Sequence, residues 1–181
     1  MRIPLSIIVS SLCLTAGCFI QPAPIVGTSP PPTGVSTPAP DAHGAIGPSG
    51  TLTPWNGPIA CAATEDLVIR NADINLASGN GPTVLGSCDI WIENSRIIAN
   101  NAGVLLQGSG DIVIRQSYVQ GRTGAVVSMG SGDVKIENSH LVGAVNLTGS
   151  GDIAVAGSLV EGRIVSRGSG DVQDLGGNQW Q

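Results

Sequence analysis

A short motif, Gly-Ser-Gly-Asp, recurs along the chain at intervals of 19 to 23 residues, and this repeat restricts the fold more than any other feature of the sequence. A period of about twenty residues is typical of solenoids, in which each repeat is one structural unit that packs against the next. The copy that ends at Asp89 has Cys88 in place of its second glycine, and a degenerate copy ends at Asp66. The copies end at Asp66, Asp89, Asp111, Asp133, Asp152 and Asp171.

Within each repeat, apolar residues alternate with variable ones, as in a β-strand that buries one face. Positions one, three and eight after the aspartate are apolar in the first five copies, and a further, largely apolar pair precedes the next turn. Each repeat therefore has three short strands and three bends, which make one coil of a parallel β-helix. The 26 glycines and the aromatic content of 3% suit thin stacked layers with tight turns. We predict an all-β fold, a small parallel β-helix (solenoid) of about five to six coils.

Two segments carry a resemblance to known families. Residues 111–117 (DIVIRQS) and 133–139 (DVKIENS) resemble the repeats of right-handed, pectate-lyase-like β-helices. The Gly-Ser-Gly-Asp turns are similar to those of the GIN-domain family, which is named for adhesin heads. Together these resemblances cover residues 60–175, and they imply a right-handed β-helix with no particular activity.

The N-terminus has the features of a secretory signal. Residues 1–17 combine Arg2 with an apolar stretch and a small-residue end, and they are too short to span a membrane. The sequence Leu14-Thr15-Ala16-Gly17-Cys18 resembles the lipobox of bacterial lipoproteins, which implies cleavage before Cys18 and its acylation. The acyl chains on Cys18 would then anchor the protein in the lipid bilayer, which is its first expected partner. Phe19, in place of the aspartate that retains such proteins at the inner membrane, implies the outer membrane if the host has one.

A change in composition separates this start from the repeats. Residues 18–58 hold most of the twelve prolines, mixed with Ser, Thr, Gly and Ala, and are expected to be a disordered linker after the lipidated Cys18. The β-helix domain is then predicted to span residues 59–181. Trp55 and Trp180 flank the repeats and are expected to cover the two ends of the core.

Two cysteines and the aspartate column need separate interpretation. Cys61 and Cys88 remain after export, and an oxidising compartment favours a disulfide between them. Stacked aspartates repel one another, so each needs a compensating partner. Hydrogen bonds from nearby backbone N–H groups in Asx-turns are the favoured explanation, and a Ca²⁺ site is the alternative. We predict no metal site and no cofactor.

The remaining outward positions are the candidates for function. The net charge of −5 and the single lysine argue against nucleic acid as a partner. The catalytic signatures of polygalacturonase-like enzymes and alginate epimerases are absent, so we favour a non-enzymatic envelope protein with a binding or structural role; the alternative is a polysaccharide lyase or hydrolase. Trp91, Arg96, Tyr118 and His140 are the predicted ligand face, for a glycan or an envelope protein.

Overall fold

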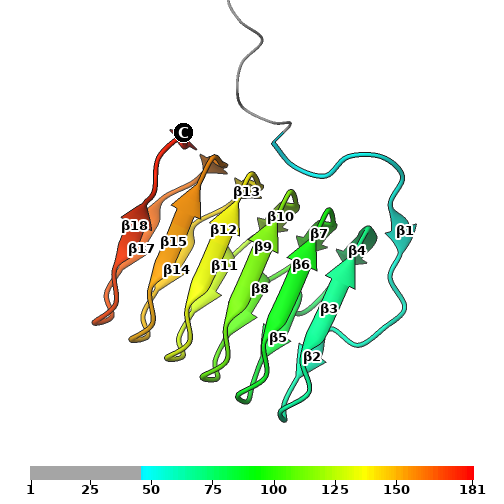
Figure 1. Cartoon of the computed structure of the whole chain (residues 1–181), viewed down its shortest axis with the longest axis horizontal. Helices are drawn as coiled ribbons and strands as arrows, with labels where there is room; N and C mark the ends of the chain where they lie inside the picture. Colours follow the sequence, from blue (N-terminus) through cyan, green and yellow to red (C-terminus); the bar gives the residue numbers. More distant parts are fainter. Residues whose placement is uncertain (1–45) are drawn as a thin grey trace, which may run out of the picture. The chain divides into compact units, whose positions relative to one another are not determined.

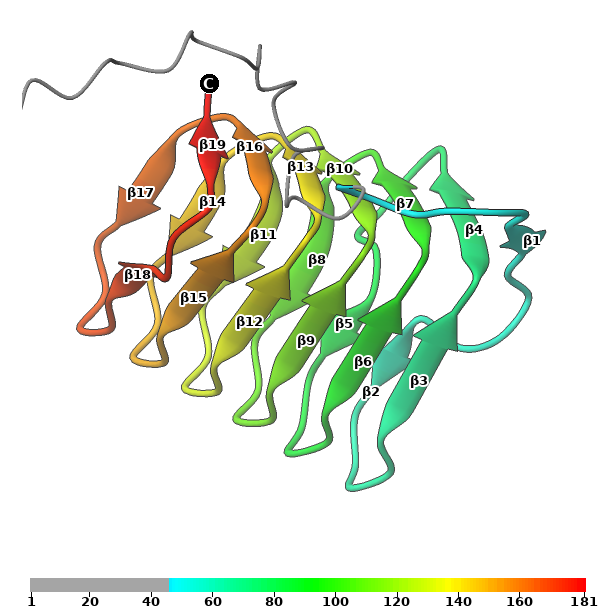
Figure 2. The same cartoon turned by 45° about the horizontal axis from the view of Figure 1, so that its top comes forward.

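The computed structural model describes residues 46–181, which form a three-sided parallel β-solenoid (Figures 1 and 2). The predicted signal peptide, Cys18 and most of the linker lie outside the described residues. The predicted fold class, an all-β parallel solenoid, is confirmed, with about six coils. The described residues contain no helix that is long and apolar enough to cross a membrane.

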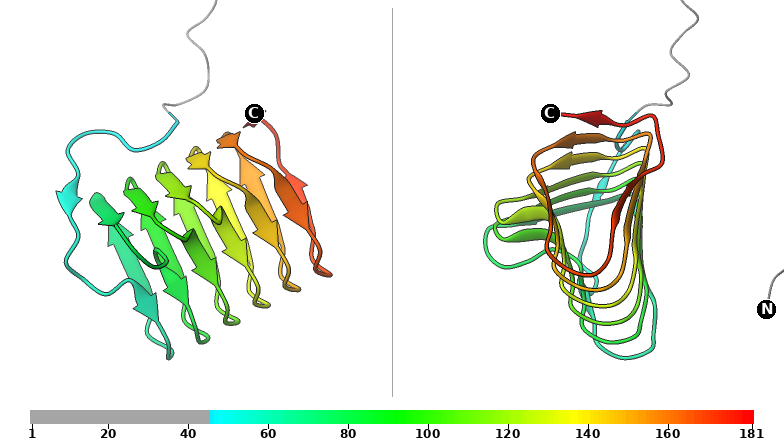
Figure 3. Two further views of the ribbon diagram at one scale, coloured as in Figure 1. Left: turned by 180° about the vertical axis from the view of Figure 1, so that it is seen from behind. Right: turned by 90° about the vertical axis from the view of Figure 1, so that its left-hand side faces the viewer.

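Each full coil contributes one strand to each of three parallel sheets, and successive coils stack as loops when viewed along the solenoid (Figure 3). Sheet C contains β3 (Leu67–Arg70), β6 (Ile90–Glu93), β9 (Ile112–Arg115), β12 (Val134–Glu137), β15 (Ile153–Ala156) and β18 (Val172–Asp174). Sheet A contains β1 (Thr53–Pro54), β4 (Ala72–Leu76), β7 (Arg96–Ala99), β10 (Tyr118–Gly121), β13 (His140–Val142), β16 (Leu159–Glu161) and β19 (Gln179–Trp180). Sheet B contains β2 (Ala60–Cys61), β5 (Thr83–Val84), β8 (Ala102–Leu106), β11 (Gly124–Ser128), β14 (Val145–Leu147) and β17 (Ile164–Ser166).

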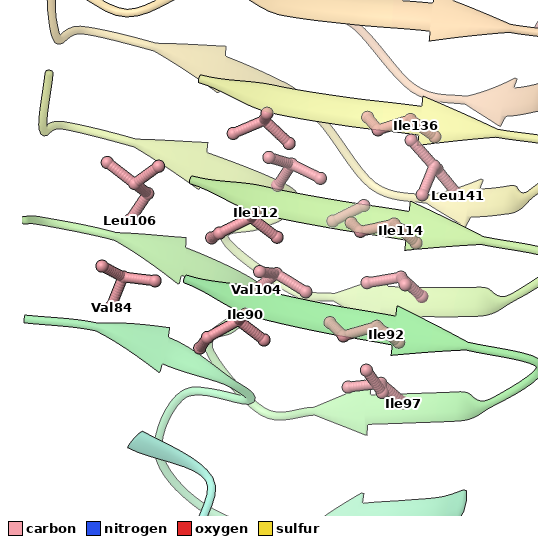
Figure 4. Close-up of a cluster of buried hydrophobic side chains, with 14 of the residues drawn as sticks. Val84, Ile90, Ile92, Ile97, Val104, Leu106, Ile112, Ile114, Ile136 and Leu141 are labelled. Carbon is pink, nitrogen blue, oxygen red and sulfur yellow. The ribbon is translucent and has the colours of Figure 1, made fainter. Parts of the chain in front are cut away.

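The inward residues of the three sheets form one continuous core (Figure 4). Ile92, Ile114 and Ile136 pair in register on β6, β9 and β12 and are completely buried. On sheet A, Ile97 and Val119 are paired and buried in the same way. Burial of each such side chain stabilises the fold by roughly 1.5–3 kcal/mol. The apolar columns predicted from the repeat are therefore the core.

A single residue in the left-handed conformation turns the chain from sheet C to sheet A. Asparagine tolerates a positive φ better than most residues, and glycine tolerates it without strain. This corner was not among the predicted features, although its residues recur at a constant position, five after the motif aspartate. They are Asn71 (φ 50°), Asn94 (φ 45°), Gln116 (φ 46°), Asn138 (φ 49°) and Gly157 (φ 57°).

A column of buried serines follows the corner and links neighbouring coils. Ser117 Oγ accepts the N–H of Ser95 at 3.1 Å and donates to the Arg115 carbonyl at 2.7 Å. Ser139 Oγ accepts the N–H of Ser117 in the same way. The column consists of Ser95, Ser117, Ser139 and Ser158, all completely buried. Because each hydroxyl both accepts and donates, these polar groups remain paired within the core.

The motif aspartates link the coils on the opposite side of sheet C. Asp111 Oδ1 accepts the backbone N–H of Asp133, and Asp133 Oδ1 accepts that of Asp152, both at 2.8 Å. The same bond joins every other neighbouring pair in the column at 2.8–3.0 Å. The prediction of backbone capping was therefore correct in kind, but the Asx-turn was wrong, because the donor belongs to the aspartate of the next coil.

The motif glycines are required by close stacking of the turns. A Cβ atom on Gly130 would collide with the carbonyl oxygen of Gly108, and one on Gly132 with that of Gly110. Cys88 takes the position of the second motif glycine and is completely buried. It forms the predicted disulfide with Cys61 of β2, with the two Cα atoms 6.2 Å apart. The disulfide ties the first strand of sheet B to the turn before β6.

The two predicted end covers lie at opposite ends of sheet A, and Trp180 remains 38% exposed. The register sets Trp180 beside Val160 of β16, at the C-terminal end of the core. Trp55 directly follows β1 and packs against the core at the other end. Each indole N–H is paired, that of Trp55 with the Pro58 carbonyl and that of Trp180 with Asp174 Oδ2.

Residues 46–52, here called the strap, run along the corner between sheets C and A (Figure 2). The N–H of Gly47 donates to the Asn138 carbonyl at 3.0 Å. Asn94 binds Ser49 through both ends of its amide: Oδ1 accepts the Ser49 N–H, and Nδ2 donates to the Ser49 carbonyl. The prediction that the disordered linker continues to residue 58 is therefore wrong for its last part, which docks on the solenoid and forms β1. Polar residues of the corner, Asn94 and Asn138, supply these bonds.

We expect Ser117→Ala to lower the free energy of unfolding by about 1–3 kcal/mol, because the buried N–H of Ser95 loses its acceptor. Ser128→Ala is the matched control, since Ser128 Oγ is buried with no hydrogen-bond partner among the described residues. Its removal leaves no group unpaired, so this variant should be neutral or slightly stabilised. Urea denaturation followed by circular dichroism measures both, and equal losses would contradict the role of the serine column.

Candidate functional site

The outer face of sheet A brings together three of the four predicted ligand-face residues. Arg96, Tyr118 and His140 are the first residues of β7, β10 and β13, and they are direct neighbours in register. Each follows a buried serine, so the alternation of the strand turns it outward. Asp73 of β4 extends the column on the side of Arg96.

Contacts within this column fix the side chains in place. Arg96 binds Asp73 through two hydrogen bonds, Nε to Oδ1 at 2.9 Å and Nη2 to Oδ2 at 2.6 Å. The rings of Tyr118 and His140 meet edge to face, with centroids 5.1 Å apart. The Tyr118 hydroxyl donates to Gln120 Oε1 at 2.9 Å. This column is therefore a preorganised surface, a property that lowers the entropic cost of binding.

A shallow groove of about 380 Å³ runs beside the column on the same sheet. Ile98, Gln120 and Val142 lie at equivalent positions of β7, β10 and β13 and line it in register. Arg122 lines it at the turn towards sheet B. On the other side of the column, Gly47 of the strap lies 3.9 Å from His140 Cβ, measured from an ideal Cβ on the glycine. The candidate site thus spans several coils between the strap and the turn.

Trp91 does not belong to this face. It lies on β6 of sheet C, where it is 38% exposed and pairs with Val68 and Val113. The predicted outward orientation and the apolar strip are confirmed, but the corner at Asn94 and the strap separate Trp91 from Arg96. The prediction of one face with Trp91 beside the Arg96 column is wrong, because the left-handed corner redirects the chain after β6.

Arginine–glutamate pairs on sheet C connect neighbouring coils. Arg70 pairs with Glu93, and Arg115 with Glu137, both at 2.6 Å. A hydrogen bond from Lys135 lowers the pKa of Glu137, and Arg115 lowers it further. Desolvation acts in the opposite direction, but the pKa remains below its ordinary value. These pairs form the alternating charge column at the fourth position after the motif aspartate. Exposed pairs of this kind contribute little stability, and they favour the correct register over a shifted one.

The described part of the chain has no cluster of side chains suited to binding a metal ion. Residues 46–181 contain no group of three or more His, Cys, Asp or Glu side chains that could hold a metal ion. The motif aspartates use one carboxylate oxygen each to accept a backbone N–H of the next coil, apart from Asp171 in the last coil.

The family model for the right handed beta helix region matches residues 54–162. The match covers the solenoid from β1 to the end of β16. Comparison with curated proteins and with solved structures found no match.

The Asp73–Arg96 pair makes a pH-dependent contribution to the site. Hydrogen bonds from Arg96 hold the pKa of Asp73 below the ordinary 3.8. Desolvation opposes this shift, and the positive charge of Arg96 adds to it. Because the pKa is lower in the folded state, the pair stabilises the fold above pH 3.8, and its contribution is lost as the pH falls through the lowered pKa.

We expect Arg96→Ala to raise the pKa of Asp73 towards 3.8, because the carboxylate loses its cationic partner. Carbon-detected NMR titration of the Asp73 carboxyl group in both proteins measures this shift. The same titration of Glu137, whose lowered pKa comes from Lys135 and Arg115 on sheet C, is the internal control and should not change. An unchanged midpoint for Asp73 would contradict the importance of the pair.

Proposed function

Because the chain belongs to the family of right-handed β-helix regions, we propose that it is a cell-envelope protein that binds a ligand on the outer face of sheet A without chemical turnover. The observation that carries the proposal is the in-register set of Arg96, Tyr118 and His140 beside a groove. This column combines a cation, a phenol and an imidazole, whereas the fourth-position column of sheet C alternates arginine with glutamate and joins coils.

The N-terminal sequence supports the proposed location. Residues 1–17 have the composition of a signal peptide, and Cys18 follows a lipobox-like sequence, so the mature chain is anchored to the envelope membrane through acylated Cys18. Phe19 favours the outer membrane if the host has one. The Cys61–Cys88 disulfide is compatible with an exported protein.

The ligand that fits this face best is a glycan, with an envelope protein as the other candidate. The Tyr118 ring offers an aromatic surface for stacking against a sugar, and the surrounding amides and paired charges can bind hydroxyl groups. A linear ligand would lie along several coils, since the groove residues come from neighbouring strands. The similarity of the turns to GIN-domain adhesin heads is consistent with a surface-binding role.

The alternative of a polysaccharide lyase or hydrolase has less support. A general acid in glycoside hydrolysis needs a raised pKa. Among residues 46–181, the carboxyl groups with shifted pKa values are Asp73, Glu137 and Asp174, and all three are shifted down. Turnover of polysaccharides would contradict the non-enzymatic assignment.

We expect Cys18→Ala to abolish acylation, since the thiol is the acceptor of the lipid. The variant should appear in the soluble or unprocessed fraction of the expressing bacterium, and labelled fatty acid should no longer be incorporated. Cys13→Ala, within the signal peptide, is the control and should leave anchoring unchanged. Normal processing and membrane retention of Cys18→Ala would contradict the proposed anchor.

A glycan array probed with the soluble chain from residue 19 tests the binding function. We expect binding that Tyr118→Ala weakens about tenfold, a loss near 1.4 kcal/mol, because the stacking surface is removed. Trp91→Ala is the matched control: it removes an exposed aromatic from sheet C and should leave binding unchanged. If only Trp91→Ala reduced binding, the site would lie on sheet C, and the sheet A proposal would be wrong.

A further inference from the structure

The charged groups on the outer face of sheet A are already paired with one another. Arg96 is held by both carboxylate oxygens of Asp73. His140 Nε2 lies 2.7 Å from Glu161 Oε1, which reaches it from the neighbouring strand β16. An anionic ligand at Arg96 would therefore compete with a carboxylate that is part of the protein, and the displaced Asp73 would lose its partner.

The groove itself is uncharged along its floor. Ile98 and Val142 flank Gln120, whose Oε1 accepts the Tyr118 hydroxyl, so its amide nitrogen can donate to a ligand. Arg122 at the rim is the cation of the groove. Asp73 and Glu161 thus place two carboxylates on this face, beside Arg96 and His140.

We infer that the ligand class of this face is a neutral glycan, one that lacks carboxylate and sulfate groups; this inference rests on the proposed function. Sugar hydroxyls donate and accept hydrogen bonds, so they can use the free lone pairs and N–H groups of the existing ion pairs without breaking them. An acidic sugar would compete with Asp73 for Arg96 and would meet Asp73 and Glu161 as like charges. The carboxylates already paired on this face thus favour the uncharged ligand.

Matched pairs of oligosaccharides test this inference directly. The probes are gluco-, galacto- and manno-oligosaccharides and their counterparts with the C6 hydroxyl oxidised to a carboxylate, titrated by calorimetry against the chain from residue 19. We expect a neutral probe to bind at least about tenfold more tightly than its acidic counterpart. Its affinity should change by less than about twofold between low and high salt, roughly 0.05 and 0.5 M.

A substitution that releases Arg96 provides the second arm of the test. In Asp73→Asn the guanidinium is no longer paired, so binding of the acidic probe should increase about tenfold relative to binding of the neutral probe. Glu93→Gln is the matched control, because it releases Arg70 in the same way on sheet C and should change neither affinity.

The outcomes separate the two proposals. Tighter, salt-sensitive binding of an acidic probe by the unmodified chain would overturn the neutral-ligand inference and leave glycan binding in place. Binding of no probe, with none found on the wider array, would overturn the binding function and this inference with it. An equal gain of acidic binding in Glu93→Gln and Asp73→Asn would show that the selectivity does not come from sheet A.

Discussion

The hydrogen bond from one motif aspartate to the next is the interaction on which the regularity of this solenoid depends. Each carboxylate oxygen that accepts the next N–H fixes the height and register of the following coil. The bond also compensates a column of like charges that would otherwise repel along the stack. Turns stacked this closely leave no room for a Cβ atom at the motif glycines. Close stacking of the turns therefore explains both the glycines and the aspartate of the motif.

Because the coils stack in constant register, residues at the same position of successive repeats lie side by side in space. Arg96, Tyr118 and His140 therefore meet although they are 22 residues apart in the chain. The fold needs its inward columns, its serines and its turns to stay constant. The outward columns are free to vary, and a binding surface can form there without disturbing the core.

The extent to which the sequence predicts this structure follows the same division. Inward positions could be predicted because burial imposes an alternation that repeats in every coil, as Ile92 and Ile114 show. The strap could not be predicted, because it is held by single hydrogen bonds from the Asn94 amide rather than by any periodic pattern. The position of Trp91 relative to Arg96 could not be predicted either, since one left-handed residue between them sets the angle between two sheets.

The strongest argument for a site on sheet A is the contrast between its outward column and the charged column of sheet C. On sheet C, Arg70 and Glu93 repeat as Arg115 and Glu137, and such alternation serves register alone. The sheet A column begins with the same kind of pair, Asp73 and Arg96, but the alternation then stops, and an aromatic pair takes the next two coils. Register does not require this change, because the core and the turns continue unaltered on both sides of it. A column that departs from the register pattern, holds its side chains in fixed contacts and borders a groove has the properties of a recognition surface.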